Sequence, residues 1–199
     1  MLVTSIIVYP RLPDRVPIHW NAHGEVNGYG TKPLGLFLLP IVMLGIWGLL
    51  RALPKIDPRR ENYARMAGAY DLIVNVVITA MAVIHLSSIA AMLGARMSLP
   101  RIMPALLGLM LIVLGSVLPK TRPNWFFGIR TPWTLSSDRV WERTHRVGGY
   151  LMIGAGVVGI VSSALPFFVG FAAIGVAVAI AGLGSVVYSY VAWKQEKSK

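Results

Sequence analysis

The chain has 199 residues, of which 55% are hydrophobic and only 14% carry a charge, and its mean hydropathy is +0.64. A folded protein surrounded by water needs more charged surface than this, so the composition excludes a soluble globular domain and indicates an integral membrane protein. The net charge of +11 would suggest nucleic acid in a soluble domain. Here the 19 Lys and Arg have only loops to occupy, so we expect the lipid bilayer as their partner and no direct nucleic-acid contact.

The first nine residues, "MLVTSIIVY", are apolar but cover only about half of a bilayer. They lack the basic start and the cleavage site of a signal peptide. Two interpretations remain open for this segment. It is either a re-entrant stub or the end of a full first helix whose beginning is missing from the chain.

The next segment, residues 12–32, reads "LPDRVPIHWNAHGEVNGYGTK" and is polar. Its two prolines and three glycines predict an irregular loop. His19 and His23 are four residues apart and close to Glu25, which on a helix would suggest zinc but in a loop means little. Cysteine is absent from the chain, and we predict neither a metal nor a cofactor. The candidate binding residues of this outer segment are His19, Trp20, Asn21 and His23.

Five apolar stretches are long enough to cross a bilayer, which needs about 20 residues. The last two share one long stretch without Asp, Glu, Lys or Arg, and Pro166 is its natural break. The predicted fold is an all-α integral membrane protein: a bundle of five full transmembrane helices plus a short N-terminal apolar stub, the remnant of a sixth. The spans are predicted at roughly 34–53, 67–95, 102–119, 147–165 and 168–193.

The basic residues divide unevenly between the loops on alternate sides of these spans. One side holds 14 Lys and Arg and the other holds five. Because basic loops stay in the cytoplasm, residues 10–33 are predicted outside, and residues 120–146 and the C-terminus inside, a bacterial cell membrane. We expect an N-terminal part, residues 1–66, with the outer loop and the first span, followed by a helical membrane domain at residues 67–199.

The second span contains three polar side chains, Asp71, Asn75 and His85, on one face of the predicted helix. Ionisable groups inside a membrane often mark a pathway for ions or solutes. One alternative function is therefore a small transporter or ion pathway that uses these three residues. Asp71 lies close to the cytoplasmic boundary, however, and a structural pairing with Arg65 or a loop arginine would explain it equally well.

The segment at residues 120–146 concentrates tryptophan and arginine in a chain that is otherwise apolar. After a cap at Ser136 or Ser137, the periodicity predicts an amphipathic helix that lies at the headgroup level. Trp125 and Trp133 are expected to anchor the preceding loop there.

Three groups on that amphipathic helix, Asp138, Glu142 and His145, fall on one face. This pattern allows a second alternative function, a membrane metal-dependent hydrolase. The plainer interpretation places Asp138 near the positive end of the helix and pairs Glu142 with Arg146 one turn later.

The segment "NWFFGIRTPWTLSSDRVWERTHRVGG" resembles the signature of the SdpI family of bacterial membrane proteins. The matching residues are Asn124, Gly128, Arg130, Thr131, Pro132, Trp133, Thr134, Trp141, Thr144, His145 and Gly148. The outer segment is similar to a domain of unknown function that commonly precedes this signature. It matches through Leu12, Pro13, Pro17, His19, Gly24 and Lys32.

This resemblance implies six membrane helices and, for the branch that gave the family its name, immunity against a secreted toxin and capture of a small transcriptional repressor. We therefore expect a membrane immunity and signalling protein that binds without catalysis. A toxin peptide would contact the outer segment and the helices, and a small cytoplasmic repressor would contact residues 120–146. Arg130 could stack between Trp125 and Trp133 or fork to a carboxylate or phosphate. The predicted partner-binding residues are Asn124, Trp125, Gly128, Arg130, Thr131, Pro132, Trp133, Thr134, Trp141, Thr144 and His145.

Overall fold

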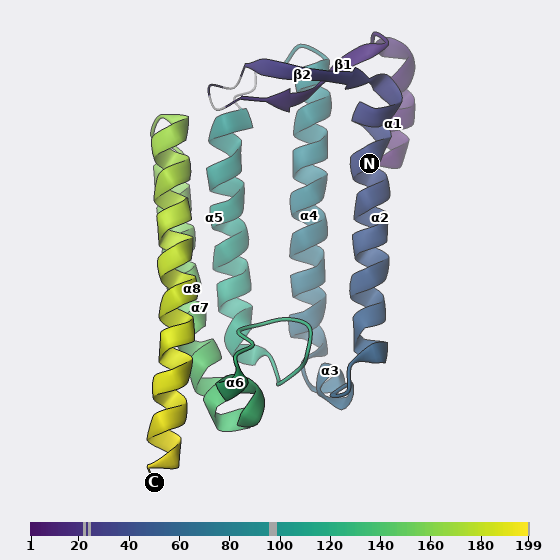
Figure 1. The fold of residues 1–199 in the computed structure, drawn as a ribbon. Coiled ribbons are helices and arrows are strands. Elements are labelled where there is room, and N and C mark those ends of the chain that lie inside the picture. The colour runs from purple at the N-terminus through teal and green to yellow at the C-terminus, as the bar shows by residue number, and fades with distance from the viewer. Residues whose placement is uncertain (22, 24, 96–98, 199) are drawn as a thin grey trace.

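The protein is an α-helical bundle in which five long helices run side by side (Figure 1). The computed structural model describes residues 1–199 apart from residues 22, 24, 96–98 and 199. The long helices are α2 (Lys32–Ile56), α4 (Ala67–Met92), α5 (Leu99–Val117), α7 (Asp138–Ser162) and α8 (Phe167–Lys197). In the described part of the chain, these five helical stretches are long and apolar enough to cross a membrane, which confirms the predicted all-α membrane fold.

Shorter elements gather at the two ends of the bundle (Figure 1). One end carries α1 (Leu2–Val8), the 3₁₀ turn η1 (Tyr9–Arg11), β1 (Arg15–Trp20) and β2 (Val26–Thr31). The opposite end carries α3 (Glu61–Arg65), η2 (Leu118–Lys120) and α6 (Pro132–Ser136), and the C-terminus lies at that end too. The outer segment and the signature segment are thus separated by the length of the bundle.

The outer segment is an antiparallel hairpin rather than the irregular loop that we predicted. β1 and β2 pair from Arg15 opposite Thr31, with register irregularities around His19. Glycine is needed at Gly28 because a Cβ there would lie 2.9 Å from the Cβ of His19. Gly28 and Gly30 therefore let the two strands approach closely, and Pro17 is tolerated because a two-stranded sheet has only edge strands.

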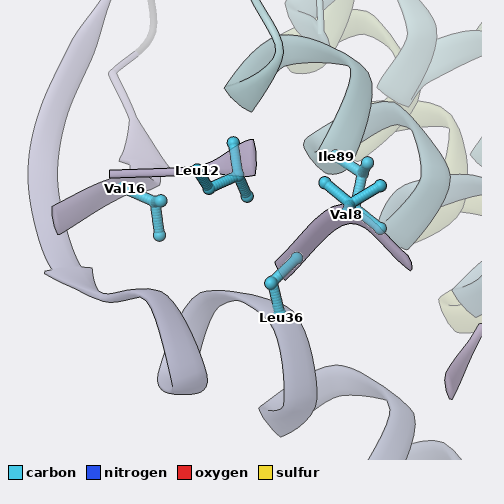
Figure 2. Close-up of a cluster of buried hydrophobic side chains, with 5 residues drawn as sticks. All are labelled: Val8, Leu12, Val16, Leu36 and Ile89. Atoms are coloured by element: carbon cyan, nitrogen blue, oxygen red, sulfur yellow. The ribbon is translucent and has the colours of Figure 1, made fainter. Parts of the chain in front are cut away.

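The hairpin and α1 are held on the helices by a small hydrophobic cluster (Figure 2). The cluster consists of Val8, Leu12, Val16, Leu36 and Ile89. Beside it, the Ser5 hydroxyl donates to the carbonyl of Leu36 at 2.8 Å. These contacts bring the first residues of the chain against the same ends of α2 and α4 that the hairpin covers.

Helices α5 and α7 approach each other through facing glycines. A Cβ on Gly156 would lie 2.5 Å from the carbonyl oxygen of Gly108, and one on Gly149 would lie 2.6 Å from that of Gly115. Small residues at such positions allow two backbones to meet and gain van der Waals contact where lipid offers no hydrophobic driving force. The close contact of α5 with α7 therefore depends on the absence of side chains.

The predicted amphipathic helix at the headgroup level is wrong as a separate element. Residues 138–146 form the first turns of α7 and continue without a break into the span. The Ser137 hydroxyl caps the helix by accepting from the backbone N–H of Val140 at 3.2 Å. The bundle covers one face of these turns, because Val140 and Trp141 are fully buried.

Candidate functional site

The signature segment folds over the end of the bundle around a buried asparagine. Asn124 is fully buried, and its Oδ1 accepts from the backbone N–H groups of Phe126 at 3.0 Å and Phe127 at 2.9 Å. Its Nδ2 donates to the carbonyl of Arg122 at 3.0 Å. The side chain of Asn124 thus supplies hydrogen bonds to backbone groups that no helix or strand satisfies, and it shapes the turn at residues 122–127.

A buried carboxylate, Asp57, joins the signature segment to the loop between α2 and α4. It is 3% exposed and accepts from the Tyr63 hydroxyl at 2.8 Å, the backbone N–H of Trp125 at 2.9 Å and the backbone N–H of Arg59 at 2.7 Å. Burial, and then the bond to Asp57, raise the pKa of the Tyr63 phenol. The sequence alone did not indicate a role for Asp57. The one feature that could have done so is the position of an acidic residue directly after a span, in a strongly basic loop.

His145 lies inside the protein with both ring nitrogens occupied. The backbone N–H of Ile129 donates to Nε2 at 2.9 Å, so this nitrogen carries no proton and Nδ1–H donates to the carbonyl of Trp141 at 2.8 Å. The imidazole also stacks on the Trp141 indole with ring centroids 3.9 Å apart. Gly128 crosses this ring at a φ of +100°, where a Cβ would lie 2.5 Å from Nε2, so the signature needs glycine there.

Two threonines connect the signature segment to the last helix. Thr131 caps α6 by accepting from the backbone N–H of Thr134 at 3.2 Å, and the Thr134 hydroxyl donates to the carbonyl of Ile129 at 2.8 Å. The Thr131 hydroxyl donates in turn to Ser189 of α8 at 3.0 Å. Both threonines therefore hold the segment in place instead of facing a partner.

Most of the predicted partner-binding residues are internal, and only a minority face outward. The buried ones are Asn124, Thr131, Thr134, Trp141, Thr144 and His145. Thr144 Oγ1 has no hydrogen-bond partner among the described residues. The exposed ones are Trp125, Gly128, Arg130 and Pro132, with Trp133 half-buried. The structure brings all of these residues into one unit, and their role in binding stays a prediction.

Arg130 uses its guanidinium in a way that the sequence did not indicate. Its Nη1 donates to the carbonyl of Trp125 at 2.6 Å and closes the loop between these two residues. The expected stacking of Arg130 between Trp125 and Trp133 is not found, because the Trp133 ring packs edge-on against Tyr190 of α8. Arg130 also lines a cavity of about 410 Å³ between the signature segment, α5, α7 and α8.

The acidic groups near His145 do not converge into a catalytic or metal site. Glu142 pairs with Arg122 at 2.7 Å, instead of with the arginine one turn along its own helix as predicted. Asp138 pairs with Arg59 at 3.3 Å. In the part of the chain that the structure describes, no three His, Asp or Glu side chains lie close enough together to hold a metal ion.

The polar residues of the second span also have separate surroundings. Asp71 pairs with Arg51 at 2.5 Å, not with Arg65. Asn75 lines a small cavity of about 260 Å³ between α4 and α5. His85 is 1% exposed, and its Nε2 lies 2.9 Å from the Ser5 hydroxyl. The three side chains share a helix but make no hydrogen bond to one another.

Three of the four outer candidates and His85, by contrast, are brought to one place. His19, Trp20, Asn21 and His85 all line a cavity of about 450 Å³ beneath the hairpin. Asn21 additionally donates to Glu25 at 2.9 Å, and its Oδ1 accepts from the backbone N–H of His23 at 2.9 Å, so both help to form the tip of the hairpin.

The chain is similar to known proteins along most of its length. Residues 120–189 match the SdpI/YfhL protein family, and residues 1–44 match a domain of unknown function, DUF1648. The chain is 30% identical to the immunity protein SdpI of Bacillus subtilis (strain 168) over 168 residues, which are 84% of this chain and 77% of that protein. No solved structure matches the chain. With its five apolar helices, it is a multi-pass bacterial membrane protein. It belongs to the SdpI/YfhL protein family.

Proposed function

We propose that this chain is an immunity protein of the bacterial cell membrane that binds a toxin and performs no catalysis. The similarity to the Bacillus subtilis immunity protein, which covers most of both chains, carries this proposal. The side-chain chemistry supports it. Both ring nitrogens of His145 are hydrogen-bonded to the backbone, and the neighbouring acids Asp138 and Glu142 are paired with arginines. These groups therefore hold the structure together.

The test is protection of a Bacillus subtilis strain from which immunity protein SdpI has been deleted. We expect expression of this chain to restore survival in the presence of the toxin against which that protein protects. An Asp71→Asn variant should protect equally well, because Asp71 pairs with Arg51 at a half-exposed position and carries no ion in this proposal. Unchanged killing at normal membrane levels of the protein would refute the immunity proposal. Loss of solute flux in proteoliposomes on Asp71→Asn, with protection intact, would favour the transport alternative.

We further propose that the hairpin faces outward and that residues 120–146 and the C-terminus face the cytoplasm. The asymmetry of 14 basic residues against five supports this orientation. The separation of the hairpin and the signature segment at opposite ends of the bundle also agrees with it (Figure 1).

Single cysteines test the orientation, since the chain has none of its own. Asp14, whose side chain is 97% exposed, and exposed Ser136 mark the two ends of the bundle. A membrane-impermeant maleimide should label Asp14→Cys in intact cells, whereas Ser136→Cys should react only after the cells are opened. Labelling of Ser136→Cys in intact cells would contradict the proposed orientation and indicate the opposite one.

A second proposed role is the binding of a small cytoplasmic repressor at the exposed part of the signature segment. Trp125 is 51% exposed, and Arg130 lies beside it with one guanidinium nitrogen committed to the carbonyl of Trp125. The remaining N–H groups of Arg130 make no hydrogen bond among the described residues, so they can contact a carboxylate of a partner, and the neighbouring indole offers apolar contact area.

A further inference from the structure

A cavity of about 450 Å³ lies at the outer end of the bundle, where the hairpin covers the gap between the helices. Its wall includes Trp20 of β1, Leu38 of α2, Ile84 of α4, Met103 of α5 and Phe167 of α8. Its volume falls within the range of cavities that bind small ligands, and its lining is largely apolar with a few polar groups. Five elements that are distant in sequence therefore contribute to one site.

His85 lines this cavity and carries a ring nitrogen that can accept a hydrogen bond. The Ser5 hydroxyl has one hydrogen, which it donates to the carbonyl of Leu36 at 2.8 Å. Ser5 must therefore accept from Nε2–H of His85, 2.9 Å away, which leaves Nδ1 of the ring unprotonated. Among the described residues, no hydrogen bond reaches Nδ1, although His85 is 1% exposed and lines the cavity.

An unpaired acceptor in apolar surroundings selects among ligands. A lipid hydrocarbon chain could fill the volume, but it has no donor and would leave Nδ1 of His85 without a partner, which is energetically unfavourable. A ligand with an apolar body and one N–H group satisfies both the wall and the imidazole. His19 and Asn21 also line the cavity and add polar groups to its wall. This mixture suits a polypeptide that inserts an apolar side chain while its backbone remains in contact with polar groups and water.

We propose that this cavity binds an apolar peptide segment that donates one N–H group to Nδ1 of His85. The proposal rests on the proposed immunity function, because a toxin peptide arriving from outside would meet this end of the bundle first. It names the part of the protein that recognises the toxin and the chemistry of recognition. No covalent step is involved.

A pair of matched probes tests the chemistry without any change to the protein. 5-Fluoroindole has an apolar ring and one N–H, whereas 5-fluoro-1-methylindole keeps the ring and lacks the donor. Binding of each to the full chain in phosphatidylcholine nanodiscs is followed by ¹⁹F NMR and corrected with empty nanodiscs. We expect 5-fluoroindole to bind about three- to tenfold more tightly than its methylated analogue, as for one hydrogen bond to a buried acceptor. Equal affinities would overturn the assignment of Nδ1 as a ligand acceptor.

Two variants separate the acceptor from the volume. His85→Phe removes Nδ1 and should abolish the preference for 5-fluoroindole. Leu38→Trp adds bulk to the cavity wall and should weaken the binding of both probes. If Leu38→Trp bound both probes as the unaltered chain does, the cavity would not be the site.

Protection assays connect the cavity to the peptide and keep the two proposals distinguishable. Leu38→Trp, at unchanged membrane levels, should lose probe binding and toxin protection together. Loss of probe binding with full protection would show that the toxin does not occupy the cavity, while the immunity function would stand. If the unaltered chain preferred 5-fluoroindole but gave no protection, the immunity proposal and the peptide occupant would both fail.

Discussion

Gly156→Leu is expected to prevent accumulation of folded protein in the membrane. A Cβ at this position would lie 2.5 Å from the carbonyl oxygen of Gly108 and 2.7 Å from Cγ1 of Ile112. The first of these atoms belongs to the backbone of α5, which cannot move aside as a side chain can. Separating α5 from α7 would cost about 3 kcal/mol or more, at the upper end of overpacking penalties. The measurement is the thermal midpoint of the purified protein in detergent, together with its membrane level.

Gly154 provides the matched control on the same helix. A Cβ at Gly154 would meet no atom within 4 Å. Gly154→Leu therefore makes the same chemical change, on a lipid-facing side of α7, without a clash. We expect normal levels and a thermal midpoint close to that of the unaltered chain. If both variants behaved alike, the facing glycines would not be what holds α5 against α7.

Arg130→Lys is expected to abolish capture of a cytoplasmic repressor nearly as completely as Arg130→Ala, if the proposed signalling role is right. The guanidinium holds the carbonyl of Trp125 at 2.6 Å through one nitrogen and has further donors in the same plane for a partner. A lysine ammonium keeps the charge but offers no planar fork and cannot serve both positions. The readout is the membrane localisation of a fluorescently tagged small cytoplasmic repressor.

Arg139→Ala controls for the loss of one positive charge at the same end of the bundle. Arg139 is exposed on the first turn of α7, so its replacement should leave both the fold and repressor capture unchanged. Full membrane retention of the repressor by Arg130→Lys would exclude a role for the planar fork. A reduced level of the Arg130 variants would instead assign this residue to closing the loop with Trp125.

The positions of four of the five long helices could be read from the sequence to within about four residues, whereas α7 begins at Asp138 and not at the predicted residue 147. Hydrocarbon excludes unpaired charge and unpaired backbone groups, so a long apolar stretch has few alternatives to a membrane-spanning helix. The hairpin was mispredicted because glycine occurs both in irregular loops and in strands where a bulky residue lies opposite. The sequence does not show which of these two reasons applies to Gly28. The separate helix at the headgroup level was mispredicted because an amphipathic pattern shows only that one face of a helix is covered. In α7 that face is covered by protein rather than by lipid.

The sequence by itself determined that the protein lies in a lipid bilayer, how many long helices it has and which segment carries its family signature. These are properties of composition and local periodicity, which each stretch of chain expresses on its own. Only the tertiary structure decided that Asn124 and His145 are internal, that Asp57 holds the signature segment, and that Ser5 meets His85. Ser5 and His85 are 80 positions apart, and no periodicity relates them. Such pairs exist because separate elements pack together, which buries polar groups and obliges each to find a partner wherever the fold supplies one.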